Sequence, residues 1–172
     1  MLDLYNSTCQ ECSQLITRRY STSFSAGIKA FDPSIRPPIY AIYGFVRFAD
    51  EIVDTFHDFP QATLFYKFKE DTWHAIDEGI SLNPVLNAFQ EVVNTYNIDK
   101  ALITAFLDSM EMDLNKEVHD QESYNRYIYG SAEVVGLMCL KIFCAGNADQ
   151  YNKLESYAQS LGSAFQKVNF LR

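Results

Sequence analysis

Four polar residues, Tyr43, Arg47, Asp50 and Asp54, lie at helical spacing within an otherwise apolar stretch. At about 100° per residue they fall within an arc of roughly 60°, with Glu51 on its edge. The opposite side of the same helix carries only apolar side chains. A helix that is apolar over most of its circumference is typical of a protein interior, where ionised carboxylates need a counter-charge.

The charges of this helix do not balance locally. Arg47 supplies one positive charge, whereas Asp50, Glu51 and Asp54 supply three negative ones. Two carboxylates one helical turn apart suit Mg²⁺, or Mn²⁺ as an alternative, which completes its shell with water and phosphate oxygens. Arg47 offers a planar donor fork that matches a phosphate. The alternative is a solvated acidic face that pairs with lysines or arginines elsewhere in the chain.

Composition narrows the class of protein. The chain has 172 residues, which predicts one domain, 1–172, with a real core. Aromatic residues make up 15%, which favours either an apolar cavity or a core rich in Phe and Tyr. The net charge of −8 leaves no basic surface for nucleic acid, so we expect no nucleic-acid partner.

The cysteines do not predict a zinc site. Cys9 and Cys12 have the spacing of half a zinc site, but no second close Cys/His pair follows them. Reduced thiols in a cytoplasmic protein are the better interpretation. No apolar stretch approaches the roughly 20 residues that span a bilayer, so we expect at most a peripheral membrane contact.

Helical periodicity runs through the chain, and no strand-period run of useful length interrupts it, so we predict an all-α fold. The predicted helices run from an Asp3 cap to about Arg18, from Pro37-Pro38 to a turn at 57–60, and over 61–80, 85–96 and 100–118, with Asp99 capping the last.

Three further stretches have two interpretations each. The hydroxyl-rich joint at residues 19–24 either caps a helix or binds a phosphate at the helix start. Gly130 and Gly136 mark the close approach of another helix or of a ligand. Gln166 and Asn169 share a helix face. Their amides either bind a metal or diphosphate, or they are core amides that bond to the backbone. The helical pattern continues to Arg172 without a stop signal, so we expect a truncated chain.

Together these motifs resemble the squalene/phytoene synthase family of head-to-head prenyl transferases over nearly the whole chain. The resemblance rests on Ser21-x-x-Phe24, Tyr43-x-x-x-Arg47-x-x-Asp50-x-x-x-Asp54, Met112-Asp113-Leu114, Tyr127-x-Tyr129 and Gln166-x-x-Asn169-x-Leu171-Arg172. It implies a class I isoprenoid synthase-like helical bundle around a central cavity, with two acidic metal-binding motifs on the rim.

The resemblance also implies an activity and roles for individual residues. The activity is the Mg²⁺-dependent joining of two prenyl diphosphates through a cyclopropyl intermediate. Geranylgeranyl diphosphate to phytoene is favoured over farnesyl diphosphate to squalene or dehydrosqualene, and NADPH is not expected. The implied metal ligands are Asp50, Asp54 and Asn169; the implied diphosphate contacts are Tyr43, Arg47, Tyr20, Ser21, Thr22, Ser23, Gln166 and Arg172; Phe24 and Tyr127 would line the prenyl pocket.

The chain departs from the family pattern at two places. Ser131-Ala132-Glu133 stands where the family commonly has Val-Ala-Gly, and Lys167 replaces an apolar residue. We hypothesise that Glu133 and Lys167 pair with each other. Because the family's second aspartate motif follows Arg172, residues 1–172 alone should bind diphosphate weakly and turn over little.

Two other classes of protein compete with this interpretation. One is an inactive helical binding or assembly protein that retains the fold. The other is a chain-elongating synthase or cyclase, which is less favoured because those enzymes usually carry D-D-x-x-D, whereas Glu51 follows Asp50 here.

Overall fold

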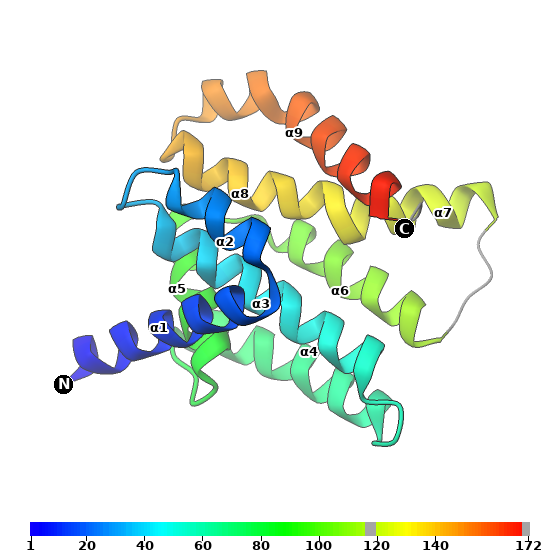
Figure 1. Cartoon of the computed structure of the whole chain (residues 1–172), viewed down its shortest axis with the longest axis horizontal. Coiled ribbons are helices and arrows are strands. Elements are labelled where there is room, and N and C mark those ends of the chain that lie inside the picture. Colours follow the sequence, from blue (N-terminus) through cyan, green and yellow to red (C-terminus); the bar gives the residue numbers. More distant parts are fainter. Residues whose placement is uncertain (116–119, 170–172) are drawn as a thin grey trace.

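The computed structural model describes residues 1–115 and 120–169, and every regular element within them is a helix (Figure 1). The elements are α1 (Leu2–Tyr20), α2 (Thr22–Lys29), α3 (Arg36–Thr55), α4 (Gln61–Glu78), α5 (Pro84–Tyr96), α6 (Lys100–Leu114), α7 (Gln121–Ile128), the π-helical turn η1 (Tyr129–Glu133), α8 (Val134–Cys144) and α9 (Ala148–Asn169). The all-α prediction is confirmed. The predicted end of the fifth helix, Val118, lies outside the described residues.

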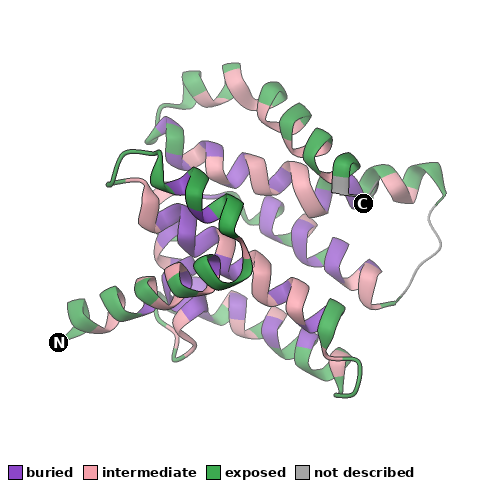
Figure 2. Ribbon diagram, viewed as in Figure 1, coloured by how far each residue is buried: buried purple, intermediate pink, exposed green. Residues whose placement is uncertain are grey.

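Helix α3 occupies the centre and contacts α1, α2, α4, α5, α6 and α8. Its Phe45 is fully buried and stacks on Phe89 at 3.8 Å between ring centroids, with Phe68 and Phe106 within 5.7 Å. Four rings from four helices therefore form the middle of the core. Figure 2 shows the buried residues gathered on these inner helices, while the outer side of α9 is exposed.

Short polar side chains cap the N-termini of several of these helices. Asn83 and Asp99 accept hydrogen bonds from the amides of Val85 and Ala101, at 3.0 and 2.8 Å. The Asp3 cap was a wrong prediction: α1 begins at Leu2, and Asp3 lies inside its first turn. A carboxylate there still interacts favourably with the helix dipole without capping a specific amide.

Glycines allow the last helices to pack closely. A Cβ on Gly130 would lie 2.4 Å from the Ala105 carbonyl oxygen, and one on Gly136 would lie 3.0 Å from that of Ala158. Helix packing therefore accounts for Gly130, whereas Gly136 both approaches α9 closely and lines the cavity described below. Gly162 on α9 approaches η1 in the same way, at 2.7 Å from the Ala132 carbonyl.

The continuous helix Gln121–Cys144 is long and apolar enough to cross a membrane by length and composition only. Half of its most apolar window is buried against the rest of the protein, as in the core helix of a bundle.

Candidate active site

A cavity of about 620 Å³ opens between α2, α3, η1, α8 and α9. Its described lining residues are Phe24, Ile28, Ile39, Ile42, Tyr43, Val46, Arg47, Asp50, Ser131, Ala132, Val135, Gly136, Cys139, Leu140, Phe143, Leu154, Tyr157, Ala158, Leu161, Gly162, Phe165 and Gln166. Most of this wall is apolar, and the only ionised groups among these residues are Arg47 and Asp50. The cavity therefore suits a ligand with a long apolar part and a charged head.

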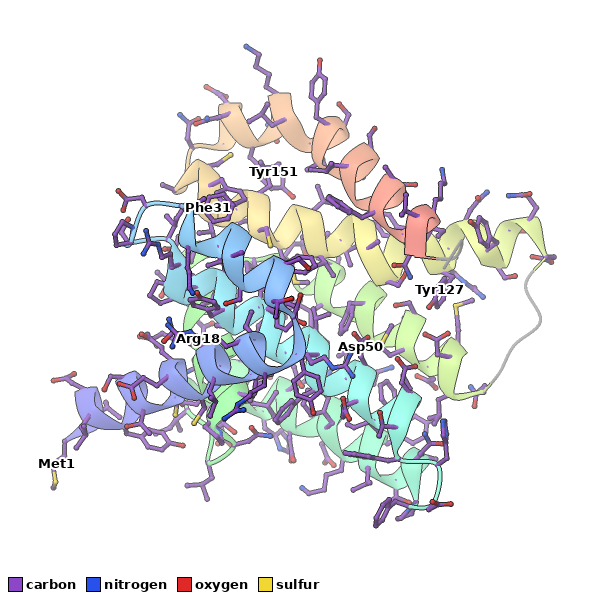
Figure 3. The ribbon with its side chains drawn as sticks, viewed as in Figure 1. Met1, Arg18, Phe31, Asp50, Tyr127 and Tyr151 are labelled. Atoms are coloured by element: carbon purple, nitrogen blue, oxygen red, sulfur yellow. The ribbon has the colours of Figure 1, made fainter. Side chains whose placement is uncertain are left out.

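The two carboxylates of α3 occupy different environments. Asp50 is partly buried and lines the cavity (Figure 3). Asp54 is exposed and lies outside the described lining residues, although we expected both carboxylates inside. In the same last turn Ile52 and Val53 are buried in the core, so Asp54 lies on the solvent-facing side of α3.

Burial and nearby negative charge change the titration of Asp50. Desolvation, followed by the Asp54 carboxylate, raises the pKa of Asp50 from 3.8 to about 7, against the lowering effect of Arg47. Asp113 on α6 and Glu51 also raise this pKa. The site accordingly favours a bound cation, either a proton or a metal ion.

Arg47 is held by two neighbours. Its Nε donates to Glu51 Oε2 at 3.2 Å and its Nη2 donates to the same oxygen. Its guanidinium also lies 4.5 Å from the centre of the Tyr20 ring, a cation–π contact. Arg47 lines the cavity, and within the residues that the structure describes these contacts use only some of the N–H donors of its guanidinium.

The joint between α1 and α2 combines a cap with a cavity wall. Ser21 Oγ accepts from the Phe24 amide at 3.2 Å, which confirms the cap interpretation. Thr22 and Ser23 are exposed in the first turn of α2. Phe24 lines the cavity and packs against Tyr43, with 5.5 Å between ring centroids. Burial raises the pKa of Tyr43, which therefore stays a neutral phenol.

Tyr127 is not among the described residues that line the cavity, although the family resemblance implied a place in the prenyl pocket. It packs with Met112 and Ile128 in a small second core, and its hydroxyl donates to Asp113 Oδ2 at 2.9 Å. Tyr127 lies close enough to Asp50 for that carboxylate to help raise the tyrosine pKa, after burial and Asp113. Asp113 and Tyr127 thus stand behind the acidic end of the cavity.

The C-terminal motif is only partly described. Gln166 lines the cavity from α9. The Asn169 side chain and Arg172 lie outside the described residues. Glu133 and Lys167 form no ion pair in the described part of the chain, so the hypothesised pairing is absent.

The donor set fits a divalent ion in part. Asp50 and Asp54 supply carboxylates one turn apart, and burial together with the Asp54 carboxylate raises the pKa of Asp50. No group of three or more His, Cys, Asp or Glu residues forms a complete metal site within the residues that the structure describes. A Mg²⁺ ion would therefore need ligands from water and a phosphate as well.

The apolar stripe of α9 was missed by sequence reasoning. Tyr157, Leu161 and Phe165 line the cavity, yet each is at least 60% exposed. Their i, i+4 spacing is a periodic signal that could have identified this wall. Because Phe24 on the opposite side is also 58% exposed, the cavity is open between α2 and α9.

Two solved structures share this fold. A dehydrosqualene synthase matches with a TM-score of 0.82, covering 96% of this chain and 56% of its own, at 23% sequence identity. A squalene synthase from Alicyclobacillus acidocaldarius matches with a TM-score of 0.81, covering 96% and 61%, also at 23% identity. The all-α arrangement is therefore that of squalene-synthase-type helical folds.

Curated relatives agree in sequence. A phytoene synthase of Pseudescherichia vulneris is 31% identical over 162 residues, covering 88% of this chain and 51% of the relative. A presqualene diphosphate synthase of Rhodopseudomonas palustris is 28% identical over 153 residues, covering 88% and 53%. The chain spans about half the length of the curated relatives it matches. The squalene/phytoene synthase family model matches residues 17–172, and the chain belongs to this family.

Proposed function

We propose that this chain contributes the first carboxylate motif of a Mg²⁺-dependent transferase that condenses two prenyl diphosphates head to head through a cyclopropyl intermediate. The observation that supports this most is that Arg47 and Asp50 both line an otherwise apolar cavity. A prenyl diphosphate has the same division, with a charged head on a long hydrocarbon tail.

Each part of the cavity has a task in this proposal. The apolar walls take up the tail and exclude water from the reacting carbons. Arg47, oriented by Glu51 and Tyr20, opposes the negative charge of the diphosphate. Asp50 and Asp54 would hold Mg²⁺ by their carboxylates. When bound, Mg²⁺ neutralises charge on the departing pyrophosphate.

The relatives support two substrate lengths. Phytoene synthases occur among them in Pseudescherichia vulneris and Daucus carota, and a 4,4'-diapophytoene synthase occurs in Staphylococcus haemolyticus. We favour geranylgeranyl diphosphate to phytoene over farnesyl diphosphate to squalene or dehydrosqualene. The stretch Gly136-Leu137-Met138 supports this preference.

Calorimetry with geranylgeranyl S-thiodiphosphate, an unreactive analogue, tests the proposal. Binding should require Mg²⁺, and Asp50→Asn should weaken it roughly tenfold or more, because a ligand to the ion is lost. The control is Asp71→Asn, which removes an exposed carboxylate that pairs with Lys67 on α4. Binding that ignores both Mg²⁺ and Asp50→Asn would favour an inactive binding protein with the same fold.

A further inference from the structure

One wall of the cavity consists of α3 and of the segment that runs antiparallel to it from the end of α1 into α2. Tyr20 lies beside the Arg47 guanidinium, at 4.5 Å from its ring centre. Four residues further along this segment, Phe24 packs on Tyr43, with 5.5 Å between ring centroids. Because Tyr43 lies four residues before Arg47, the two contacts fix an antiparallel register along this wall.

The same register gives this wall a charged end and an apolar end. Its next step pairs Ile28 with Ile39, and both of these buried side chains line the cavity. Asp50 lines the cavity at the other end of α3. The eleven residues from Ile39 to Asp50 span about 16 Å of helix at 1.5 Å per residue.

The opposite wall consists of α8 and α9, which are antiparallel as well. A Cβ on Gly162 would lie 2.7 Å from the Ala132 carbonyl oxygen, and one on Gly136 would lie 3.0 Å from that of Ala158. The two contacts are again four residues apart on each side. This wall therefore runs in a fixed register from η1 toward the C-terminal end of α8.

Two phenylalanines join the walls at one end. Phe143 lines the cavity from the last turn of α8, and its ring meets Phe31 edge to face with 5.2 Å between centroids. Phe31 follows Ile28 by three residues, so this contact places Phe143 at the apolar end of the cavity. Figure 3 shows the labelled Phe31 well apart from Asp50.

We infer that the Phe143 ring, backed by Phe31, stops the far end of the prenyl tail and so limits the chain length that the cavity accepts. This inference rests on the proposed function, which puts the diphosphate at Arg47 and Asp50. Four extended isoprene units are longer than the helix span between Asp50 and Ile39, so the last unit of a geranylgeranyl tail reaches Phe143. A fifth unit would meet the ring.

Phe143→Ala tests this stop with prenyl S-thiodiphosphates of four and five isoprene units, measured by calorimetry in Mg²⁺. The dissociation constant of the five-unit analogue divided by that of the four-unit analogue should fall roughly tenfold, because the vacated space takes up the apolar fifth unit. Since the ratio is taken within one protein, a loss of folded protein cancels. Phe143 is 43% exposed, so the substitution removes no fully buried side chain.

Phe59→Ala is the matched control. Phe59 also forms an edge-to-face pair, with Phe56 at 6.1 Å between ring centroids, and it is exposed and not among the described cavity-lining residues. Its replacement should leave the ratio of the two dissociation constants unchanged.

Leu154→Phe makes the opposite change. Leu154 lines the cavity one turn of α9 before Ala158, toward the Phe143 end. A larger ring there should weaken binding of the four-unit analogue roughly tenfold, because it fills the space of the last unit. Binding of farnesyl S-thiodiphosphate, which has three units, should weaken by less than about threefold.

The outcomes separate this inference from the proposed function. Mg²⁺-dependent binding by the wild type, with an unchanged ratio in Phe143→Ala, would overturn the inference alone, since the tail would then leave through the opening between α2 and α9. Equal weakening of the three-unit and four-unit analogues by Leu154→Phe would also overturn it. If the wild type binds no analogue in a Mg²⁺-dependent way, the proposed function itself fails.

Discussion

The hydroxyl of Tyr127 donates a hydrogen bond to Asp113 Oδ2 at 2.9 Å and so joins α7 to α6 behind the acidic end of the cavity. Burial and this carboxylate raise the tyrosine pKa, so the phenol keeps its proton as a donor. The contact holds Asp113, a third carboxylate near Asp50, in a fixed position. The residue pair therefore stabilises the charge arrangement of the site.

Replacing Tyr127 with Phe should destabilise the protein by about 1–3 kcal/mol, because it removes a donor from a partly buried carboxylate. Tyr66→Phe is the matched control, since Tyr66 makes the same kind of bond to Glu111 at 2.9 Å on the exposed surface. We expect the control to change the free energy of unfolding by less than about 0.5 kcal/mol. Urea titration of both variants measures the difference, and equal losses would contradict the role of burial.

The stability of the free chain should depend on pH through Asp50. Its pKa is raised from 3.8 to about 7, so the folded chain holds a proton that the unfolded chain has released between these values. This contribution is full below about pH 4 and is lost as the pH rises through 7, by up to about 4 kcal/mol. Asp50→Asn removes this pH-dependent contribution of Asp50 to stability. The other carboxyl groups with shifted pKa titrate in both proteins, so their effects cancel in the comparison. Urea titrations from pH 4 to 8 should therefore show the variant gaining stability relative to the wild type; parallel profiles would contradict this.

Arg47→Lys should weaken binding of inorganic pyrophosphate with Mg²⁺ roughly tenfold, because an ammonium lacks the planar fork that matches phosphate oxygens. The loss of stability should be below about 1 kcal/mol, since the ion pair with Glu51 is partly exposed. Arg36→Lys is the control, as Arg36 is only partly buried and its Nε donates to the Phe31 carbonyl oxygen, away from the described cavity-lining residues. Calorimetry compares the two; similar affinities would remove Arg47 from the anion site.

Local pattern was sufficient to predict the helices and much of the site. The apolar periodicity around Phe45 predicted a buried α3, and Asp99 caps α6 as expected. Placement of Arg47, Asp50 and Phe24 at one cavity followed from their spacing and from the family resemblance. These features depend on neighbours in sequence, which a single chain reveals.

The remaining features depend on contacts between distant segments. Asp54 lies on the exposed side of α3, and the Tyr127 hydroxyl donates its hydrogen bond to Asp113 on α6. The π turn around Ser131 has no local sequence signal, since it arises where η1 packs on α6 and α9. The Arg47–Glu51 ion pair follows from their i, i+4 spacing, but the three acidic residues of α3 favoured the prediction of a metal site.

Gly162→Ala should destabilise the protein by about 1–3 kcal/mol, because the new Cβ would lie 2.7 Å from the Ala132 carbonyl oxygen and 3.0 Å from the Glu133 Cα. Both atoms belong to the backbone, so α9 must move away from η1 and the cavity wall moves with it. Gly27→Ala is the opposite case: no atom lies within 4 Å of its Cβ on α2, and Ala should stabilise by about 0.4–1 kcal/mol. Thermal unfolding gives both values, and calorimetry with geranylgeranyl S-thiodiphosphate should show weaker binding only for Gly162→Ala. A neutral Gly162→Ala would mean that α9 is not closely packed on η1.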